Sequence, residues 1–154
     1  MIRIEDWKLL LIDEDDEARQ TLSAFLEDAG YGVLTVADGE SGIELCREES
    51  PQIIITEIDL PGIDGIEVLK SIKKAYPYSE VIVTSAYDEI ESALKSFRLD
   101  AADFITKPIN EDTLMAALER AKKRCDIQRK LQDYTAFLEE RWMDTSEELA
   151  KIFN

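Results

Sequence analysis

Five short apolar runs alternate along this chain with segments of helical periodicity, and this alternation constrains the fold more than any other feature. Runs of this length between helical patterns indicate buried strands. The predicted strands are residues 9–12, 33–36, 53–56, 81–84 and 103–106. Strands that alternate with helices predict an α/β fold, in which a parallel sheet is covered by helices on both faces.

Four amphipathic helices are predicted between these strands. Gly30 ends the first helix, Ser50-Pro51 ends the second, and the third stops before Pro77. The apolar residues that mark the four helices are Ala18, Leu22, Phe25, Leu26 and Ala29, then Ile43 with Leu45 or Cys46, then Ile66, Leu69 and Ile72, then Ile90, Ala93, Leu94 and Phe97. Right-handed crossovers between parallel strands leave few topologies open for this order of elements.

Carboxylates follow the first and third predicted strands. Asp13 and Glu14 come directly after the first, and Glu57 follows the third, four residues before a Pro61-Gly62 turn. The carboxyl ends of parallel strands share one edge, where open α/β sheets build their sites. If these strands are neighbours, we expect the three carboxylates to converge and a hard cation such as Mg²⁺ to relieve their repulsion. Three separate, solvated loop acids are the alternative.

A hydroxyl and an ammonium group are predicted at the same edge. Ser85 ends the fourth strand and Lys107 follows the fifth. Beside a carboxylate, one donor and one neutralising positive charge are what a phosphoryl group requires. Taken alone, either residue is an ordinary strand-end or surface residue, and the prediction depends on their combination with the acids.

Residues 8–121 resemble the receiver domains of bacterial response regulators, the phosphorylated signalling modules of two-component systems. The segments that carry the resemblance are residues 9–15 (LLLIDED), 53–65 (IIITEIDLPGIDG), 81–87 (VIVTSAY) and 102–109 (ADFITKPI). The resemblance implies a flavodoxin-like doubly wound sheet with five parallel strands in the order 2-1-3-4-5. It also implies a histidine kinase or phosphotransfer protein as partner.

The resemblance assigns expected roles to individual residues. Mg²⁺ in such domains is bound by an acidic pair, by the phosphoacceptor and by a backbone carbonyl two residues further on. The corresponding positions here are Asp13, Glu14, Glu57 and the carbonyl of Asp59. The phosphoryl-binding and switch positions are Ser85, Phe104 and Lys107, and the Lys107–Pro108 peptide bond is a candidate for the cis form.

Two residues depart from the family pattern, because Glu replaces the usual Asp at Glu57, the acceptor position, and at Glu14 in the acidic pair. Negative charge is retained at both, so cation binding is expected to survive in weakened or altered form. Each side chain is longer by on the order of 1.5 Å. Because phosphoryl transfer depends on alignment, a shift of this size costs about a hundredfold in rate.

Three functional hypotheses follow. The favoured one is a pseudo-receiver, an unphosphorylated interaction module in which the Glu57 carboxylate imitates part of a phosphoryl group. The second is a competent receiver that takes a phosphoryl group on Glu57 from a histidine kinase with Mg²⁺. The third, least favoured, is an Mg²⁺-dependent phosphatase with Asp13 as nucleophile, and otherwise we expect no enzymatic activity beyond self-phosphorylation and dephosphorylation.

Composition restricts the remaining possibilities. The formal charge is −16, with 34 acids against 18 bases, which argues against a nucleic-acid surface within the chain. The first residues lack the layout of a signal peptide, and no apolar run is long enough to span a membrane. Cys46 and Cys125 are isolated and there is no histidine, so we expect reduced thiols, a cytoplasmic location and neither a usual zinc site nor a common catalytic triad.

The chain from Asn110 onward contains no Gly or Pro, so a single helix is predicted to its end. We expect residues 1–121 to form the receiver domain, and residues 122–154 to extend the helix as a coiled-coil linker or dimerisation element. Apolar positions of the first part are Leu114, Leu118, Ala121 and Cys125, and heptad positions of the second are Leu131, Thr135, Leu138, Trp142, Thr145, Leu149 and Ile152. The two registers differ by three residues near Gln128, which resembles a stammer.

The extension is expected to pair in a homodimer and to lead to an output domain beyond Asn154, whereas a solvated, partly frayed tail is the alternative. The basic run at residues 120–124 is predicted to be a solvated face, because acids outnumber bases elsewhere on this helix.

Overall fold

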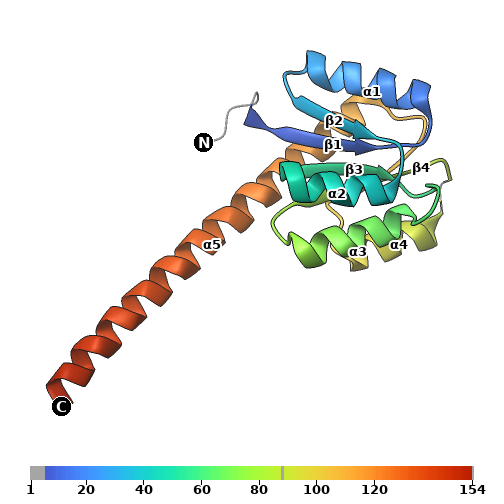
Figure 1. Cartoon of the computed structure of the whole chain (residues 1–154). Coiled ribbons are helices and arrows are strands. Elements are labelled where there is room, and N and C mark those ends of the chain that lie inside the picture. The colour runs from blue at the N-terminus through green and yellow to red at the C-terminus, as the bar shows by residue number, and fades with distance from the viewer. Residues whose placement is uncertain (1–5, 88, 154) are drawn as a thin grey trace.

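The strands form one five-stranded parallel sheet in the order β2-β1-β3-β4-β5, as expected (Figure 1). The computed structural model describes residues 6–87 and 89–153. The strands are β1 (Lys8–Ile12), β2 (Gly32–Val36), β3 (Ile53–Glu57), β4 (Glu80–Ser85) and β5 (Asp103–Thr106). Each predicted strand is confirmed to within one residue at either end, and β5 agrees at both ends.

Five helices connect and cover the strands. They are α1 (Asp16–Asp28), α2 (Gly39–Glu49), α3 (Gly65–Ala75), α4 (Ile90–Arg98) and α5 (Glu111–Phe153). Asp side chains cap the first three, because Asp15, Asp38 and Asp64 each accept hydrogen bonds from N–H groups of the first helical turn. The side chain of Asn110 does the same for α5.

Alternate residues of each strand supply two separate cores. Leu9 and Leu11 of β1 face α1 and α5, whereas Leu10 and Ile12 face α2 and α3. The central strands β1, β3 and β4 are therefore apolar on both faces, which is why their sequences are continuous apolar runs rather than alternating ones.

Helix α4 forms where predicted, but the residues that mark it remain largely in solvent. Ile90, Leu94 and Phe97 are each about half exposed or more, and Ser96 is the buried residue of this helix. Its apolar periodicity therefore predicts the helix correctly without indicating core packing.

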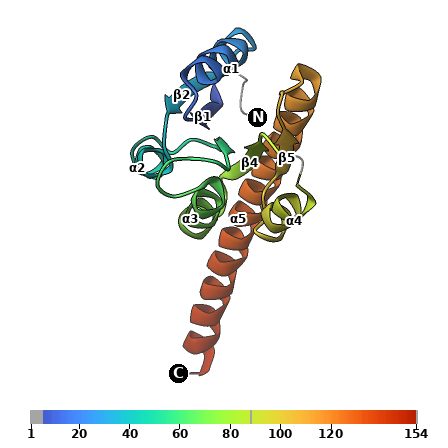
Figure 2. The same ribbon diagram turned by 90° about the vertical axis from the view of Figure 1, so that its right-hand side faces the viewer.

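Helix α5 has two parts with different surroundings. Its buried side chains end at Cys125, one turn beyond the predicted domain boundary at residue 121. Within residues 126–153 every described side chain is exposed or half-buried, and the helix projects away from the domain (Figures 1 and 2). No helix in the described part of the chain has the length and apolar character needed to cross a membrane.

The predicted solvated face at residues 120–124 is wrong for Lys122 and Arg124, whose side chains are 15% and 33% exposed, whereas the Arg120 side chain is 55% exposed. Arg120 pairs with Asp103, and Arg124 pairs with Glu80 and Asp100. Lys122 pairs with Glu119 and lies 5.2 Å from the centre of the Tyr31 ring. These bases lie where α5 still covers the sheet, so acids from the sheet and its loops lie within reach.

Candidate functional site

The predicted site residues lie together at the carboxyl edge of the sheet. Asp13 follows β1, Glu57 ends β3, Ser85 ends β4 and Lys107 follows β5. Asp13, Glu57 and Ser85 are buried, with exposed fractions of 3%, 8% and 4%. Parallel strands end at the same edge, so residues far apart in the sequence are brought to one place by topology alone.

Lys107 binds two of the predicted carboxylates at once. Its Nζ donates to Oδ2 of Asp13 at 2.7 Å and to Oε1 of Glu57 at 3.1 Å. One ammonium therefore neutralises half of the negative charge that the two acids carry. The Lys107–Pro108 peptide bond that follows is cis.

The three charges shift one another's titration. Burial lowers the pKa of Lys107, but the hydrogen bonds to Asp13 and Glu57 outweigh burial and raise it overall. Burial likewise raises the pKa of Asp13, but the bonds from Lys107 and the Asp15 N–H outweigh it, so the pKa lies below its ordinary value. Burial together with the neighbouring Asp13 raises the pKa of Glu57 despite the opposing Lys107. Glu57 is thus the acid that holds a proton more readily.

Glu57 also carries an unsatisfied acceptor. Its Oε2 is buried and has no hydrogen-bond partner among the described residues. A buried carboxylate oxygen without a donor is unfavourable unless a cation, a proton or a ligand reaches it. This oxygen marks the point of the site where a further group would bind.

The expected convergence of three carboxylates is wrong, because Glu14 is exposed. Within residues 6–87 and 89–153, no three acidic or thiol side chains are placed to hold a metal ion together. The chain is still extended at Asp13, whose N–H donates to the Val36 carbonyl, and successive side chains of an extended chain point in opposite directions. With Asp13 turned toward the sheet edge, Glu14 points into solvent.

A donor set for Mg²⁺ survives without Glu14. Mg²⁺ is bound through one or two carboxylates and keeps several waters, so Asp13 and the free oxygen of Glu57 fit its requirements. Asp59 is exposed in the loop after β3, and the role of its carbonyl stays a prediction.

Two further residues complete the predicted set. The Oγ of Ser85 accepts a hydrogen bond from the N–H of Tyr87 at 3.1 Å, which orients the hydroxyl at the end of β4. Phe104 is half-buried and packs against the core on the α2 and α3 face. Neither residue contacts Glu57 through a hydrogen bond among the described atoms.

The β3–α3 loop is held close beneath the site by a glycine. A Cβ added at Gly65 would lie 2.2 Å from the carbonyl oxygen of Glu57, a distance that no side chain tolerates. The N–H of Gly65 donates to the Ile58 carbonyl at 2.8 Å and closes the loop. Gly65 is therefore required for α3 to begin directly under the strand end.

A cavity beside Asp13 and Lys107 was not predicted from the sequence. Its volume is about 390 Å³, and it lies between α1 and the segment that joins β5 to α5. Its apolar wall includes Leu22, Phe25 and Ile109. The first two were predicted only as part of a core-facing helix surface, and their half-buried state is what leaves the cavity open.

Comparison with known proteins agrees with this fold. Residues 9–119 match the family described as "Response regulator receiver domain". A putative NtrX-like response regulator of Rickettsia bellii is 31% identical over 136 residues, which are 82% of this chain and 28% of that protein.

Solved structures show the same likeness. The crystal structure of NtrX from Brucella abortus in complex with ADP has a TM-score of 0.77 and 30% identity, over 82% of this chain and 29% of that one. A receiver domain protein from Clostridium thermocellum has a TM-score of 0.75 and 27% identity, over 79% of this chain and 98% of that one. The chain thus spans less than a third of the NtrX-type relatives that it matches. By sequence and by structure, the chain belongs to the response regulator receiver family of two-component signalling.

Proposed function

We propose that this receiver is a pseudo-receiver whose pocket already imitates part of the phosphorylated state. The observation that carries the proposal is the 3.1 Å contact between Lys107 Nζ and Glu57 Oε1. The family resemblance assigns to this lysine the neutralisation of a phosphoryl group. In this chain the longer side chain of Glu57 presents a carboxylate oxygen to the ammonium directly, with less charge than a phosphate brings.

A cation at this site would bind to Asp13 and to the free oxygen of Glu57, in competition with Lys107. When bound, Mg²⁺ supplies positive charge that offsets the two carboxylates and any incoming phosphoryl oxygens. Because Lys107 already offsets one of the two negative charges, we expect weaker Mg²⁺ binding than a pocket of carboxylates alone would show.

A competent phosphoacceptor is the second candidate, and one observation favours it. Glu57 Oε2 is free of hydrogen bonds among the described residues, so a lone pair is available to attack phosphorus. A phosphatase that uses Asp13 as nucleophile is less favoured, because its Oδ1 and Oδ2 both accept hydrogen bonds.

Incubation with acetyl phosphate and Mg²⁺, followed by intact-mass measurement, separates the two candidates. The pseudo-receiver proposal expects no added phosphate on the wild-type chain under conditions that label Glu57→Asp. A phosphate on the wild type that disappears in Glu57→Gln would overturn it. A turnover of simple phosphate esters would instead revive the phosphatase.

We further propose that residues 126–153 of α5 pair with a second copy of the chain and lead to an output domain beyond residue 154. Ile127 and Tyr134, which the heptad prediction omits, are exposed alongside its apolar members. The exposed apolar residues of this part are Ile127, Leu131, Tyr134, Phe137, Leu138, Trp142, Met143, Leu149, Ile152 and Phe153. Within them Ile127, Leu138 and Leu149 recur every eleven residues, a period that keeps one stripe on an almost straight helix.

Light scattering tests the pairing. The chain shortened to residues 1–130 keeps every buried residue of α5, so we expect a folded monomer where the full chain is a dimer. The double variant Leu131→Lys/Leu138→Lys should also be monomeric, whereas Gln132→Lys, outside the stripe, should remain a dimer. A dimer that survives the shortening would place the interface elsewhere.

A further inference from the structure

A third buried carboxylate, in addition to Asp13 and Glu57, lies at the amino end of β4. Glu80, the first residue of the strand, has no exposed surface, and Ser85 at the other end belongs to the site already described. A charged side chain is seldom fully buried without charged partners, because its desolvation is expensive. Glu80 is therefore a residue whose presence in the core requires a reason.

Glu80 belongs to a closed ring of alternating charges. Its Oε2 lies 3.0 Å from Arg124 Nε, and its Oε1 lies 3.6 Å from Lys73 Nζ. Asp100 closes the ring, because its Oδ1 and Oδ2 lie 2.6 Å from Arg124 Nη2 and 3.5 Å from Lys73 Nζ. Two acids and two bases make the ring neutral.

The ring joins elements from both faces of the sheet. Lys73 comes from α3 on one face and Arg124 from α5 on the other, while Asp100 lies in the turn that enters β5. Backbone carbonyls hold both bases in place. Lys73 donates to those of Pro77 and Ser79 at 3.0 Å, and Arg124 donates to that of Ala101 at 3.3 Å.

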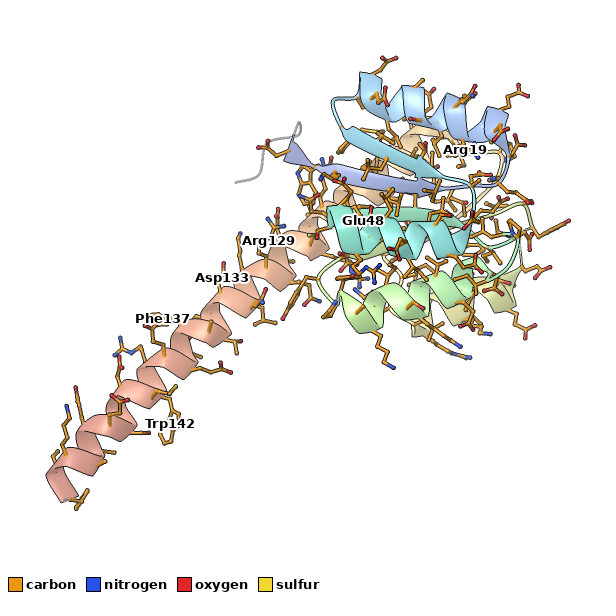
Figure 3. The ribbon with its side chains drawn as sticks, in the orientation of Figure 1. Arg19, Glu48, Arg129, Asp133, Phe137 and Trp142 are labelled. Carbon is orange, nitrogen blue, oxygen red and sulfur yellow. The ribbon has the colours of Figure 1, made fainter. Side chains whose placement is uncertain are left out.

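Arg124 lies in the last turn of α5 that packs against the sheet. The next residue, Cys125, is the last buried residue of the helix, and the following turns project freely with Arg129, Asp133, Phe137 and Trp142 turned outward (Figure 3). The ring thus holds α5 at the turn where it leaves the domain. Buried ion pairs stabilise a fold little more than apolar residues of the same volume would. Neither buried oxygen of Glu80 accepts a hydrogen bond among the described residues, so Glu80 attracts Lys73 and Arg124 through charge, and the directional contacts of Arg124 are its hydrogen bonds to Asp100 and to the Ala101 carbonyl.

We propose that the ring of Lys73, Glu80, Asp100 and Arg124 is a positioning device that fixes the direction in which α5 leaves the receiver. Apolar packing at Ala121 and Cys125 keeps the helix on the sheet but lets it tilt, because dispersion contacts have little directionality. The ring restricts this tilt, because Arg124 is attracted by the charge of Glu80 in the strand and donates hydrogen bonds to Asp100 and Ala101 in the loop. The proposal is independent of whether Glu57 accepts a phosphoryl group.

Spin-label distances across the joint test the proposal. Spin labels are attached at Lys74 on α3 and at Glu140 on α5, because both positions are exposed. The two native cysteines are buried. Dilution with unlabelled chain isolates the distance within one molecule. The variant Glu80→Met/Arg124→Met replaces the buried pair by apolar side chains of similar length. We expect it to unfold at a urea concentration no lower than the wild type, while the distance distribution broadens by about twofold.

Lys123→Met is the matched control, because Lys123 is exposed one residue before Arg124 and makes no ion pair among the described residues. Its distribution should equal that of the wild type. Glu80→Gln, which keeps the shape and removes the charge, decides the question if the double variant does not fold. An unchanged, narrow distribution in whichever of these variants folds would overturn the proposal and leave the ring a part of the core only.

Discussion

Both ends of β4 bring carboxylates and positively charged side chains together, but the charges balance at one end only. At the carboxyl end, Lys107 faces two carboxylates, and one oxygen of Glu57 is left without a hydrogen-bond partner among the described residues. At the amino end, the charges of Lys73 and Arg124 equal those of Glu80 and Asp100, although both oxygens of Glu80 also lack a hydrogen-bond partner among the described residues. Charge balance, rather than the presence of buried acids, therefore separates a site that can receive a group from one that only holds elements together.

The largest expected effect is at the closed end. Arg124→Ala leaves Glu80 buried with only the more distant Lys73, and we expect the free energy of unfolding to fall by about 3–5 kcal/mol in urea titrations. Lys123→Ala should change it by less than about 0.5 kcal/mol. If the two variants lose equal stability, the ring is not the balanced structure inferred from its distances.

The next effect is chemical and is expected only at the open end. Glu57→Asp shortens the carboxylate toward the length usual in the family, and we expect acetyl phosphate to label this variant under conditions that leave the wild type unlabelled. Glu80→Asp shortens the buried acid at the amino end of β4 and should leave the labelling rate unchanged. Intact-mass time courses measure both, and a rate that does not respond to Glu57→Asp would show that carboxylate length is not what limits this pocket.

The third effect is a pH dependence with the same direction at both ends, because burial raises the pKa of Glu80 as well as that of Glu57, so a substitution is needed to isolate the part due to Glu57. Glu57 has a raised pKa, so the folded state holds its proton more tightly than the unfolded state does. Ionisation of Glu57 therefore destabilises the fold as the pH rises through the window between the ordinary value of 4.5 and the raised one. Glu57→Gln lacks this loss, so its unfolding free energy should improve relative to the wild type from pH 4.5 toward neutral. If the difference in unfolding free energy between Glu57→Gln and the wild type stays constant with pH, the pKa of Glu57 is not raised in the folded state.

The smallest effect is at the exposed corner of the ring. The Asp100 side chain is 58% exposed, so its pairs with Arg124 and Lys73 are screened by water. Asp100→Asn keeps a residue that tolerates the backbone φ of 70° at this position, and we expect a loss of about 0.2–1 kcal/mol. If Asp100→Asn lowers the free energy of unfolding as much as Arg124→Ala does, then Asp100 rather than Glu80 is the acid that contributes most to the stability of the ring.

Sequence reasoning succeeds where topology alone decides position. Asp13, Glu57, Ser85 and Lys107 end parallel strands, so their meeting follows from the order of the strands. It fails where the direction of a single side chain decides, as for Glu14, which adjoins Asp13 yet points the other way.

The ring could not be predicted because it depends on how α5 is rotated above β4. In the sequence, Glu80 is an acid before an apolar strand and Arg124 is one of several bases on a helix, and nothing marks them as partners. The signal in hindsight is an acid directly at the start of a fully buried strand, because a charged side chain is seldom fully buried.

Because α5 is long, a small change in its angle where it leaves the domain moves its far end by a large distance. At about 1.5 Å per residue, the part beyond Cys125 reaches roughly 40 Å from the domain. A tilt of about 5° at Arg124 therefore displaces the far end by about 3–4 Å, which is close to the displacements that reset packed helix interfaces. The ring around Arg124 holds α5 in one direction and permits only a small tilt. A small movement in the receiver therefore becomes a larger displacement at the far end of α5, where a partner can detect it.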